Sequence, residues 1–285
     1  MKKTQRYIVL ALLVIIYLLS VYIFLGESWQ QNSFIQNSVA IACSILAPIL
    51  AFLIDQILQN INQLKFFWMT KVRLRNQKIR FSMSYIFRIH VNDKYLLVKN
   101  SKWNFYQPVG GVYKINTGEE RMLMDKYGIE RDKKMKSSGI AKNDLRVFVP
   151  AKNAIGFLKW FNSGKNREIS HWREFYEELI NPEAGVLSIE KFPHIEYRFA
   201  GNLKTPLKYN KRWECYELLS YDVYDLMPTP EQEEVLISLL NQGDTDYIKW
   251  ADEKIIQSLG YDEREKRDIY EIGAHTKWTL NLKYE

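Results

Sequence analysis

Two long apolar runs open the chain, with a short polar segment between them. The first run covers residues 7–25, the second covers residues 34–54, and neither contains a charged side chain. At about 1.5 Å of rise per residue, each helix comes close to crossing a hydrocarbon core of about 30 Å. The pattern predicts a transmembrane helical hairpin within residues 1–60.

The charges that flank these runs predict their orientation. Lys2, Lys3 and Arg6 precede the first run, whereas the connecting segment has Glu27 and no lysine or arginine. More basic residues follow the second run: Lys65, Lys71, Arg73, Arg75, Lys78 and Arg80. By the positive-inside rule, we expect both termini in the cytoplasm.

From about residue 66 to residue 285 the pattern is that of a cytoplasmic domain. Alternating or β-rich segments predict strands at 78–91, 94–100, 144–150, 194–201 and 211–226, and a loop-to-strand step at 104–115. Helical spacing predicts helices at 151–161, 166–180, 229–240 and 245–259. Asn92–Asp93 is expected to form the turn between the first two strands. Thr229 is expected to cap the third helix, with Pro230 at its first position, and Pro182 to end the second. This order predicts an α+β domain.

Composition narrows the chemistry. The chain has 285 residues, a formal charge of +7 and two cysteines, Cys43 and Cys215, which lie far apart. A disulfide framework and a zinc site are therefore not expected. No Walker loop or Ser-His-Asp set is present, and the scattered histidines are expected to be structural: His90, His171, His194 and His275.

The second apolar run also has small residues at helical spacing. Ala40, Ser44, Ala47 and Ala51 fall on one face, which we call the small face. Such faces let helices approach closely in lipid. Two alternatives remain open, namely packing against the first helix of the hairpin and contact between protomers.

Two segments together resemble the Nudix family of phosphate-cleaving enzymes. "YLLVKNSKWNFYQPVGGVYK" contains a Pro-x-Gly-Gly step into a strand, and "REFYEEL" has the Arg-Glu-apolar-x-Glu-Glu order. The resemblance implies that Arg173 orients Glu174, while Glu177 and Glu178 hold a divalent metal ion. The three glutamates are three and four residues apart and therefore line one face of a helix.

The chain also departs from the Nudix pattern. A long insertion separates Gly111 from Arg173, Thr117 stands where the family has a glutamate, and Ile180 stands where it has a glycine. We therefore expect a solvated helix face or a relict, with no catalysis and no cofactor, in preference to a working metal site. Mg²⁺ is expected only if the chain hydrolyses its ligand.

Two predicted membrane helices before a degenerate Nudix-like domain resemble the Nudix-type effectors of CBASS, a bacterial anti-phage signalling system. The segment "EIGAHTKWTL" supports the resemblance. The resemblance implies that a cyclic-nucleotide synthase makes a cyclic di- or trinucleotide, which the soluble domain binds. Protomers then associate, and the helices disrupt the inner membrane and kill the cell. A DNA or RNA duplex is not an expected partner.

A pocket for such a ligand needs cations for the phosphates and aromatic planes for the bases. The candidate residues are Arg80, Arg88, Trp103, Phe105, Tyr106, Arg146, Arg212 and Trp213. For each of them an ordinary role stays open, because aromatic side chains on strands are commonly core and arginines are commonly solvated.

Two rival functions remain open. A membrane-tethered Nudix hydrolase of a nucleoside diphosphate derivative would need Mg²⁺ and the glutamates of "REFYEEL". A membrane scaffold that recruits a protein partner would instead expose an apolar patch and lack affinity for nucleotides.

Overall fold

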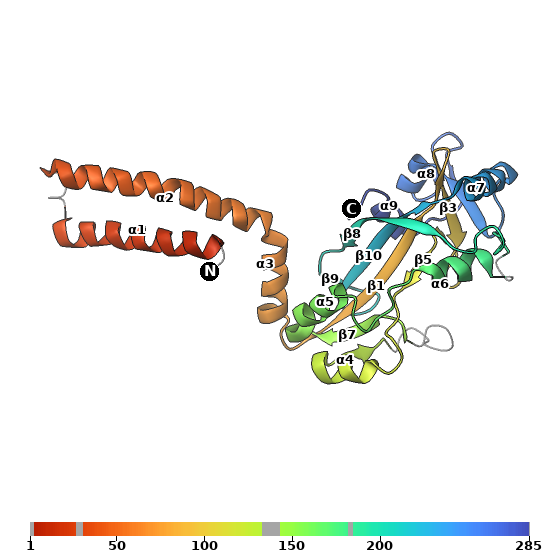
Figure 1. Ribbon diagram of the computed structural model, residues 1–285, viewed down its shortest axis with the longest axis horizontal. Helices are drawn as coiled ribbons and strands as arrows, with labels where there is room; N and C mark the ends of the chain where they lie inside the picture. The colour runs from red at the N-terminus through yellow and green to blue at the C-terminus, as the bar shows by residue number, and fades with distance from the viewer. Residues whose placement is uncertain (1–2, 27–30, 133–142, 182–184, 285) are drawn as a thin grey trace. The chain divides into compact units, whose positions relative to one another are not determined.

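The computed structural model describes residues 3–26, 31–132, 143–181 and 185–284. The chain divides into two compact units, Met1–Arg73 and Leu74–Glu285 (Figure 1). The N-terminal unit holds the predicted hairpin, and the second unit holds the mixed α and β domain. The first unit also includes residues 61–73, a short helical segment that follows the hairpin.

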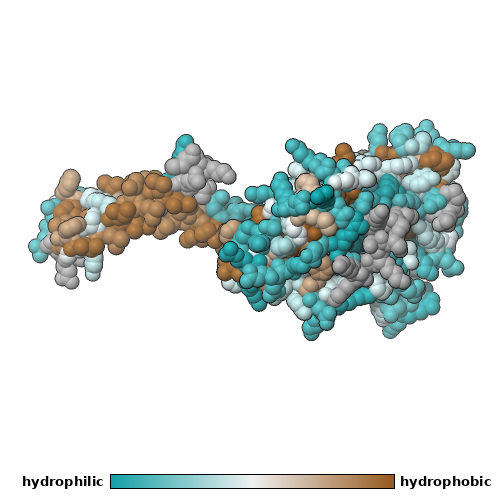
Figure 2. Space-filling model, turned by 90° about the horizontal axis from the view of Figure 1, so that it is seen from below, coloured by the Kyte–Doolittle hydropathy of each residue, from teal (hydrophilic) through white to brown (hydrophobic). Residues whose placement is uncertain are grey.

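The N-terminal unit is a pair of helices that lie side by side (Figure 1). Its elements are α1 (Lys3–Leu25), α2 (Ser33–Gln59), α3 (Ile61–Trp68) and the π-helical turn η2 (Met69–Arg73). The segments Arg6–Leu25 and Ser33–Gln59 are long and apolar enough to cross a membrane, judged by length and composition. Their side chains form a continuous apolar surface (Figure 2).

A narrow stripe holds α1 and α2 together. Ala11 of α1 and Ala42 and Ile49 of α2 are buried, although most side chains of both helices are exposed. At the two ends of the stripe, the Tyr17 hydroxyl lies 2.5 Å from Ser38 Oγ, and the Tyr7 ring centroid lies 4.8 Å from that of Phe52.

The second unit is built on a seven-stranded sheet with the order β6-β7-β1-β10-β8, in which β5 also pairs with β1 and β9 with β10. The strands are β1 (Lys78–Arg88), β5 (Gly110–Val112), β6 (Glu130–Arg131), β7 (Arg146–Pro150), β8 (Glu196–Lys204), β9 (Lys208–Asn210) and β10 (Cys215–Met227). β1 runs parallel to β10 and antiparallel to β5 and β7.

A second sheet has the order β11-β3-β2, with β4 paired to β3. Its strands are β2 (His90–Val91), β3 (Lys94–Lys99), β4 (Tyr106–Gln107) and β11 (Ile248–Ala251), and a separate ribbon joins β12 (Tyr261–Asp262) to β13 (Arg267–Asp268). The predicted turn between β2 and β3 is confirmed. Asn92 and Asp93 have positive φ angles of 45° and 63°, as a two-residue hairpin of the type I′ class requires.

The helical elements of the second unit are short. They are α4 (Glu120–Tyr127), η4 (Ala151–Asn153), α5 (Ala154–Asn162), α6 (Trp172–Phe175), η5 (Tyr176–Ile180), α7 (Pro230–Gln242), α8 (Glu253–Gln257) and α9 (Ala274–Leu280). The predicted start of α7 is confirmed, because the Thr229 side chain accepts from the Gln232 backbone N–H in a reciprocal capping box.

Two predicted helices are wrong in part. Residues 245–259 are strand β11 followed by α8, because Ile248 pairs with Val98 of β3 and the Asp252 side chain then caps a new helix. The helix predicted at 166–180 begins only at Trp172, and residue Arg167 forms an extended bridge with Ile115. Pro182, predicted to end that helix, lies outside the described residues.

β1 is the central strand and is buried on both faces. Its apolar face packs on α5 and α6, with ring centroids 5.1 Å apart for Phe81–Phe157 and 5.8 Å apart for Phe87–Phe175. The polar residues of the other face are buried too: Arg80 is only 4% exposed, and Ser82 and Ser84 are buried as well. Arg80 is covered by its partners Asp132 and Glu217 and by the Trp213 ring.

Candidate functional site

The "REFYEEL" segment forms a helix that changes its geometry partway. α6 is a single α-helical turn, and η5 continues it as a π-helix, in which the Asn181 backbone N–H donates to the Tyr176 carbonyl at 2.8 Å. Phe175 and Leu179 are fully buried and fix the helix on the domain. Single π-turns are rare and are frequent at functional sites.

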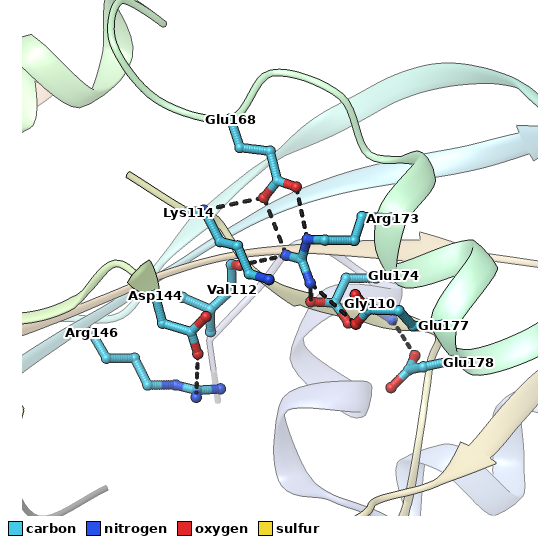
Figure 3. A network of polar contacts seen from close by, with 10 residues as sticks. All are labelled: Gly110, Val112, Lys114, Asp144, Arg146, Glu168, Arg173, Glu174, Glu177 and Glu178. Atoms are coloured by element: carbon cyan, nitrogen blue, oxygen red, sulfur yellow. Dashed lines mark hydrogen bonds and ion pairs between the residues drawn. The ribbon is translucent and has the colours of Figure 1, made fainter. Parts of the chain in front are cut away.

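Arg173 lies at the centre of a carboxylate cluster (Figure 3). Its Nε donates to Glu168 Oε1 at 2.8 Å, and its Nη1 donates to Glu174 and, at 3.3 Å, to Glu177 Oε2. Its Nη2 donates to the Val112 carbonyl at 3.0 Å. We call Arg173, Glu168, Glu174 and Glu177 the Arg173 cluster.

The glycine pair lies directly against this helix. The Gly110 backbone N–H donates to Glu178 Oε2 at 2.8 Å. A Cβ on Gly111 would lie 1.9 Å from Glu174 Oε1, and a Cβ on Gly110 would lie 2.3 Å from the Tyr85 carbonyl oxygen. Only glycine lets the strand and the carboxylates approach this closely. The two halves of the motif therefore meet in space, although a long insertion separates them in sequence.

Burial controls the charge state of these carboxyl groups. Burial raises the pKa of Glu174, a shift that Arg173 opposes only in part, and it raises the pKa of Glu178 well above its usual range. Side-chain exposure is 14% for Glu174 and 28% for Glu177. The expectation of a solvated helix face is therefore wrong, because the glutamates are packed between the helix and β5.

The donor set does not fit a divalent metal ion in this arrangement. Among the residues that the structure describes, no three His, Cys, Asp or Glu side chains are placed to hold one ion. The guanidinium of Arg173 already donates to three carboxylates, and Glu178 accepts from the Gly110 backbone N–H. The buried Tyr85 hydroxyl is a neutral phenol whose pKa burial raises further. It is a poor ligand for such an ion.

Four of the eight predicted ligand residues come together elsewhere on the domain. The guanidinium of Arg212 lies 4.2 Å from the Trp103 ring centroid and 5.8 Å from that of Trp213, and the guanidinium of Arg80 lies 4.7 Å from Trp213. We call this alternating set the cation–π ladder. Trp103 is 42% exposed, whereas Arg80 is 4% exposed, so the ladder runs from the surface into the interior.

Arg80 is the buried end of this ladder, and its charge is already satisfied. Its Nε donates to Asp132 Oδ2 at 2.7 Å, and its Nη1 donates to Glu217 Oε2 at 2.5 Å. Both acidic side chains are also largely buried, with side-chain exposures of 1% for Asp132 and 11% for Glu217. Arg80 is thus placed to support the ladder from below rather than to reach solvent.

The other four predicted ligand residues make other contacts and are not part of the ladder. Arg146 pairs with Asp144 at 2.9 Å, and Arg88 pairs with Asp225 at 2.6 Å. The ring centroids of Phe105 and His275 are 6.0 Å apart, and the Tyr106 hydroxyl donates to the Asp246 carbonyl at 2.8 Å. Arg80 and Arg88 do share a face of β1, but eight residues of strand separate them by about 26 Å.

His171 joins a buried polar network. Its Nε2 lies 2.9 Å from the Tyr113 hydroxyl, which donates to Asp222 Oδ2 at 2.7 Å. Burial lowers the pKa of His171 to about 4, so the ring is neutral at physiological pH. This arrangement agrees with the structural role expected for the histidines.

Sequence reasoning missed two sets of site residues. Glu168 lies five residues before Arg173, a spacing that does not predict contact, and only the extended backbone brings the two together. Lys208, Tyr209 and Lys211 belong to the interleaved stretch "KYNKRW", of which only Arg212 and Trp213 were selected. The alternation of basic and aromatic residues was a signal that could have found the whole stretch.

The small face of α2 points away from α1. Ala40, Ser44, Ala47 and Ala51 are all exposed, whereas Ala42 and Ile49 make the contact with α1. Packing inside the hairpin therefore does not use the small face. Contact between protomers stays a prediction.

Comparison with known proteins gives a family match and two remote structural matches. A family model described as "SMODS-associated NUDIX domain" matches residues 78–280. A bifunctional NMN adenylyltransferase/ADP ribose pyrophosphatase from Francisella tularensis, complexed with AMP and Mn ion, is 11% identical with a TM-score of 0.24. That match covers 83% of this chain and 52% of the other, so this chain spans about half of its length.

A NUDIX family hydrolase from Clostridium perfringens is 13% identical with a TM-score of 0.19, and the match covers 70% of this chain and 97% of that one. No curated protein matches the chain.

Proposed function

Because this chain belongs to the family of SMODS-associated NUDIX domains, with a Nudix-like fold behind two membrane-length helices, we propose that it is a membrane effector of an anti-phage cyclic-oligonucleotide signalling system. A cyclic di- or trinucleotide from a partner synthase binds the soluble domain. Binding drives association of protomers, and the helices then disrupt the inner membrane and kill the infected cell.

The observation that carries this proposal is the pairing, in one chain, of two such helices with a domain of this family. The same chain joins a part that recognises a ligand to a part that acts on lipid. Basic residues precede the first helix and follow the second, and the loop between them has none. By the positive-inside rule, we propose that both termini lie in the cytoplasm.

The state of the Arg173 cluster supports binding without hydrolysis. Nudix-type chemistry needs carboxylates free to hold a metal ion against a pyrophosphate. Here Arg173 bonds to Glu168, Glu174 and Glu177. In this arrangement the motif braces α6 against β5 and leaves the ligand intact.

A ligand drives assembly only if it binds the assembled state more tightly than the separate protomers. Once the soluble domains cluster, the tethered helices meet at a high effective concentration. The small face of α2 suits this step, because it is exposed and lets helices approach closely in lipid.

The proposal is tested with the full chain purified in detergent and incubated with cyclic di-AMP, cyclic di-GMP, cyclic GMP–AMP and cyclic tri-AMP. We expect one of these to bind, to increase the size of the particle, and to release dye from liposomes that contain the protein. Failure of all such compounds to bind would overturn the proposal.

The second candidate is a membrane-tethered Nudix hydrolase. It is favoured by the close approach of Glu174 to Gly111 and by the hydrogen bond from Gly110 N–H to Glu178. This function requires Arg173 to release the carboxylates so that Mg²⁺ can bind. It predicts Mg²⁺-dependent, multiple-turnover cleavage of a nucleoside diphosphate derivative, which product analysis by chromatography would detect.

A further inference from the structure

A hollow of about 370 Å³ opens beside β9. The β8–β9 connection, β9, β10, α9 and the segment after α9 form its walls. Its lining includes Lys208, Tyr209, Lys211, Glu217, Trp278 and Tyr284. The volume falls within the range of about 300–1,000 Å³ that is typical of small-molecule sites, at its lower end. We call this site the β9 hollow.

The hollow carries positive charge. Lys208 and Lys211 are exposed, and Lys208 Nζ lies 4.7 Å from the Tyr284 ring centroid, a cation–π contact that holds the ammonium at the wall. The acidic side chain of the lining, Glu217, accepts from Arg80 and, at 3.0 Å, from Asn210 Nδ2, and the two lysines of the lining outnumber it. The hollow therefore attracts an anion.

The hollow also presents aromatic planes. Tyr209 is 54% exposed, and the rings of Trp278 and Tyr284 are in contact with centroids 4.6 Å apart. Exposed rings beside lysines are the combination that single nucleotides use, since bases stack on the rings and phosphates pair with the ammonium groups.

The cation–π ladder begins next to the hollow. Asn210, which lines the hollow, accepts through Oδ1 from the backbone N–H groups of Arg212 at 3.0 Å and Trp213 at 3.3 Å. This turn sets Arg212 against Trp103. A second stacking surface is therefore fixed beside the first.

The Arg173 cluster offers the opposite chemistry. Glu168, Glu174 and Glu177 surround one arginine, and Glu178 lies beside them. Without a metal ion, these carboxylates repel a phosphate group.

We infer that the β9 hollow, and not the Nudix-type motif, binds one phosphate-bearing nucleotide unit of the ligand; this inference rests on the function proposed above. A cyclic di- or trinucleotide seated there leaves its other units outside the hollow. Those units extend over the cation–π ladder or reach a second copy of the chain, which ties occupation of the hollow to assembly.

The test measures binding of the cyclic nucleotide probes named above to the full-length chain in detergent, at two salt concentrations. Lys208→Gln with Lys211→Gln is expected to weaken binding by about tenfold or more and to reduce its salt dependence. Tyr209→Ala is expected to weaken binding without changing the salt dependence, because it removes a stacking plane and no charge. The matched control, Lys254→Gln with Lys266→Gln, removes the same charge from exposed positions elsewhere and is expected to bind as wild type.

The pair Glu177→Gln and Glu178→Gln separates the two sites and is expected to leave binding unchanged. If the wild-type chain binds a probe and the hollow variants bind equally well, or if the Glu177 and Glu178 variants lose binding, the inference is overturned while the proposed function stands. If the wild-type chain binds none of the probes, the proposed function fails, and this inference fails with it.

Discussion

In this structure Arg173 bonds to glutamates of the "REFYEEL" motif that the Nudix resemblance assigned to a metal ion. Its guanidinium donates to Glu168, Glu174 and Glu177, and together these four side chains brace α6 against β5. Burial acts to lower the pKa of Arg173, but the hydrogen bonds that it donates to Glu168 and the charge of Glu174 raise the pKa overall, so the arginine stays charged. Its charge is what allows the carboxylates to remain half-buried.

Glu178 provides a stability test at this scale. Because burial raises its pKa in the folded state, the folded protein binds more protons than the unfolded chain. Stability therefore falls as the pH rises from the ordinary glutamate pKa of about 4.3 toward the raised value. Glu178→Gln removes this loss and keeps an acceptor for Gly110 N–H. We expect a higher melting temperature than wild type at pH 7 and little difference near pH 4.

Glu178→Ala is the matched comparison. It removes the charge and also the acceptor, which leaves the buried Gly110 N–H without a partner at a cost of about 1–3 kcal/mol relative to the glutamine variant. A glutamine variant that is less stable than wild type at pH 7 would contradict the assignment of Glu178 as a buried, destabilising charge.

We expect Arg80 to contribute to the stability of the domain more than to direct contact with the ligand. Arg80→Met removes the guanidinium that pairs with the buried Asp132 and Glu217, so we expect a loss of about 3–5 kcal/mol in urea unfolding of the full chain. Arg198→Met makes the same change in an exposed pair with Asp225 and is expected to have little effect. Equal losses in the two variants would show that burial is not the cause.

At the scale of elements, α2 has two distinct faces. One face packs on α1 through Ala42 and Ile49, and the small face is exposed. Residues 245–259 show the limit of apolar spacing as a predictor. Their spacing fits a helix, but the backbone of β11 pairs with β3. Spacing shows which positions are apolar, and the available partner decides which element forms.

The small face of α2 gives a prediction about the toxicity of the protein to the cell. Ala47→Leu or Ala51→Leu should weaken toxicity in cells that also express the cognate synthase, because added bulk keeps helices of neighbouring protomers apart. Nucleotide binding and the α1–α2 contact should not change. Loss of viability at the wild-type level in both variants would exclude the small face as the toxic contact.

Ile45→Phe is the control for this experiment. It adds volume at an exposed position of α2 that lies about 160° around the helix from Ala47. We expect it to kill as wild type. Ala42→Leu enlarges the side that packs on α1 and is expected to disturb the hairpin itself, which cross-linking between α1 and α2 would reveal.

At the scale of the whole molecule, the question is whether the ligand is consumed. The double variant Glu177→Gln, Glu178→Gln should retain binding, ligand-dependent association and toxicity, because the proposed function uses neither carboxylate for catalysis. A hydrolase would lose its Mg²⁺-dependent turnover in the same variant. Toxicity assays beside product analysis separate the two functions, and a measurable turnover by wild type that this variant lacks would favour the hydrolase.

The sequence alone determined the features that depend on local composition. Uncharged apolar length predicted α1 and α2, the Thr229–Pro230 signal predicted the start of α7, and Asn92–Asp93 predicted the hairpin turn. These features need no distant partner. The motif halves also indicated the Nudix-like fold, since the glycine pair and the glutamates each occur intact.

Only the tertiary structure decided which charges are buried, which are paired and what surrounds them. It placed Glu168 on Arg173, packed Arg80 between Asp132 and Glu217, and formed the β9 hollow from segments that are far apart in the sequence. The physical reason is that burial and ion pairing depend on neighbours brought together by the fold. A residue's type and spacing do not specify those neighbours.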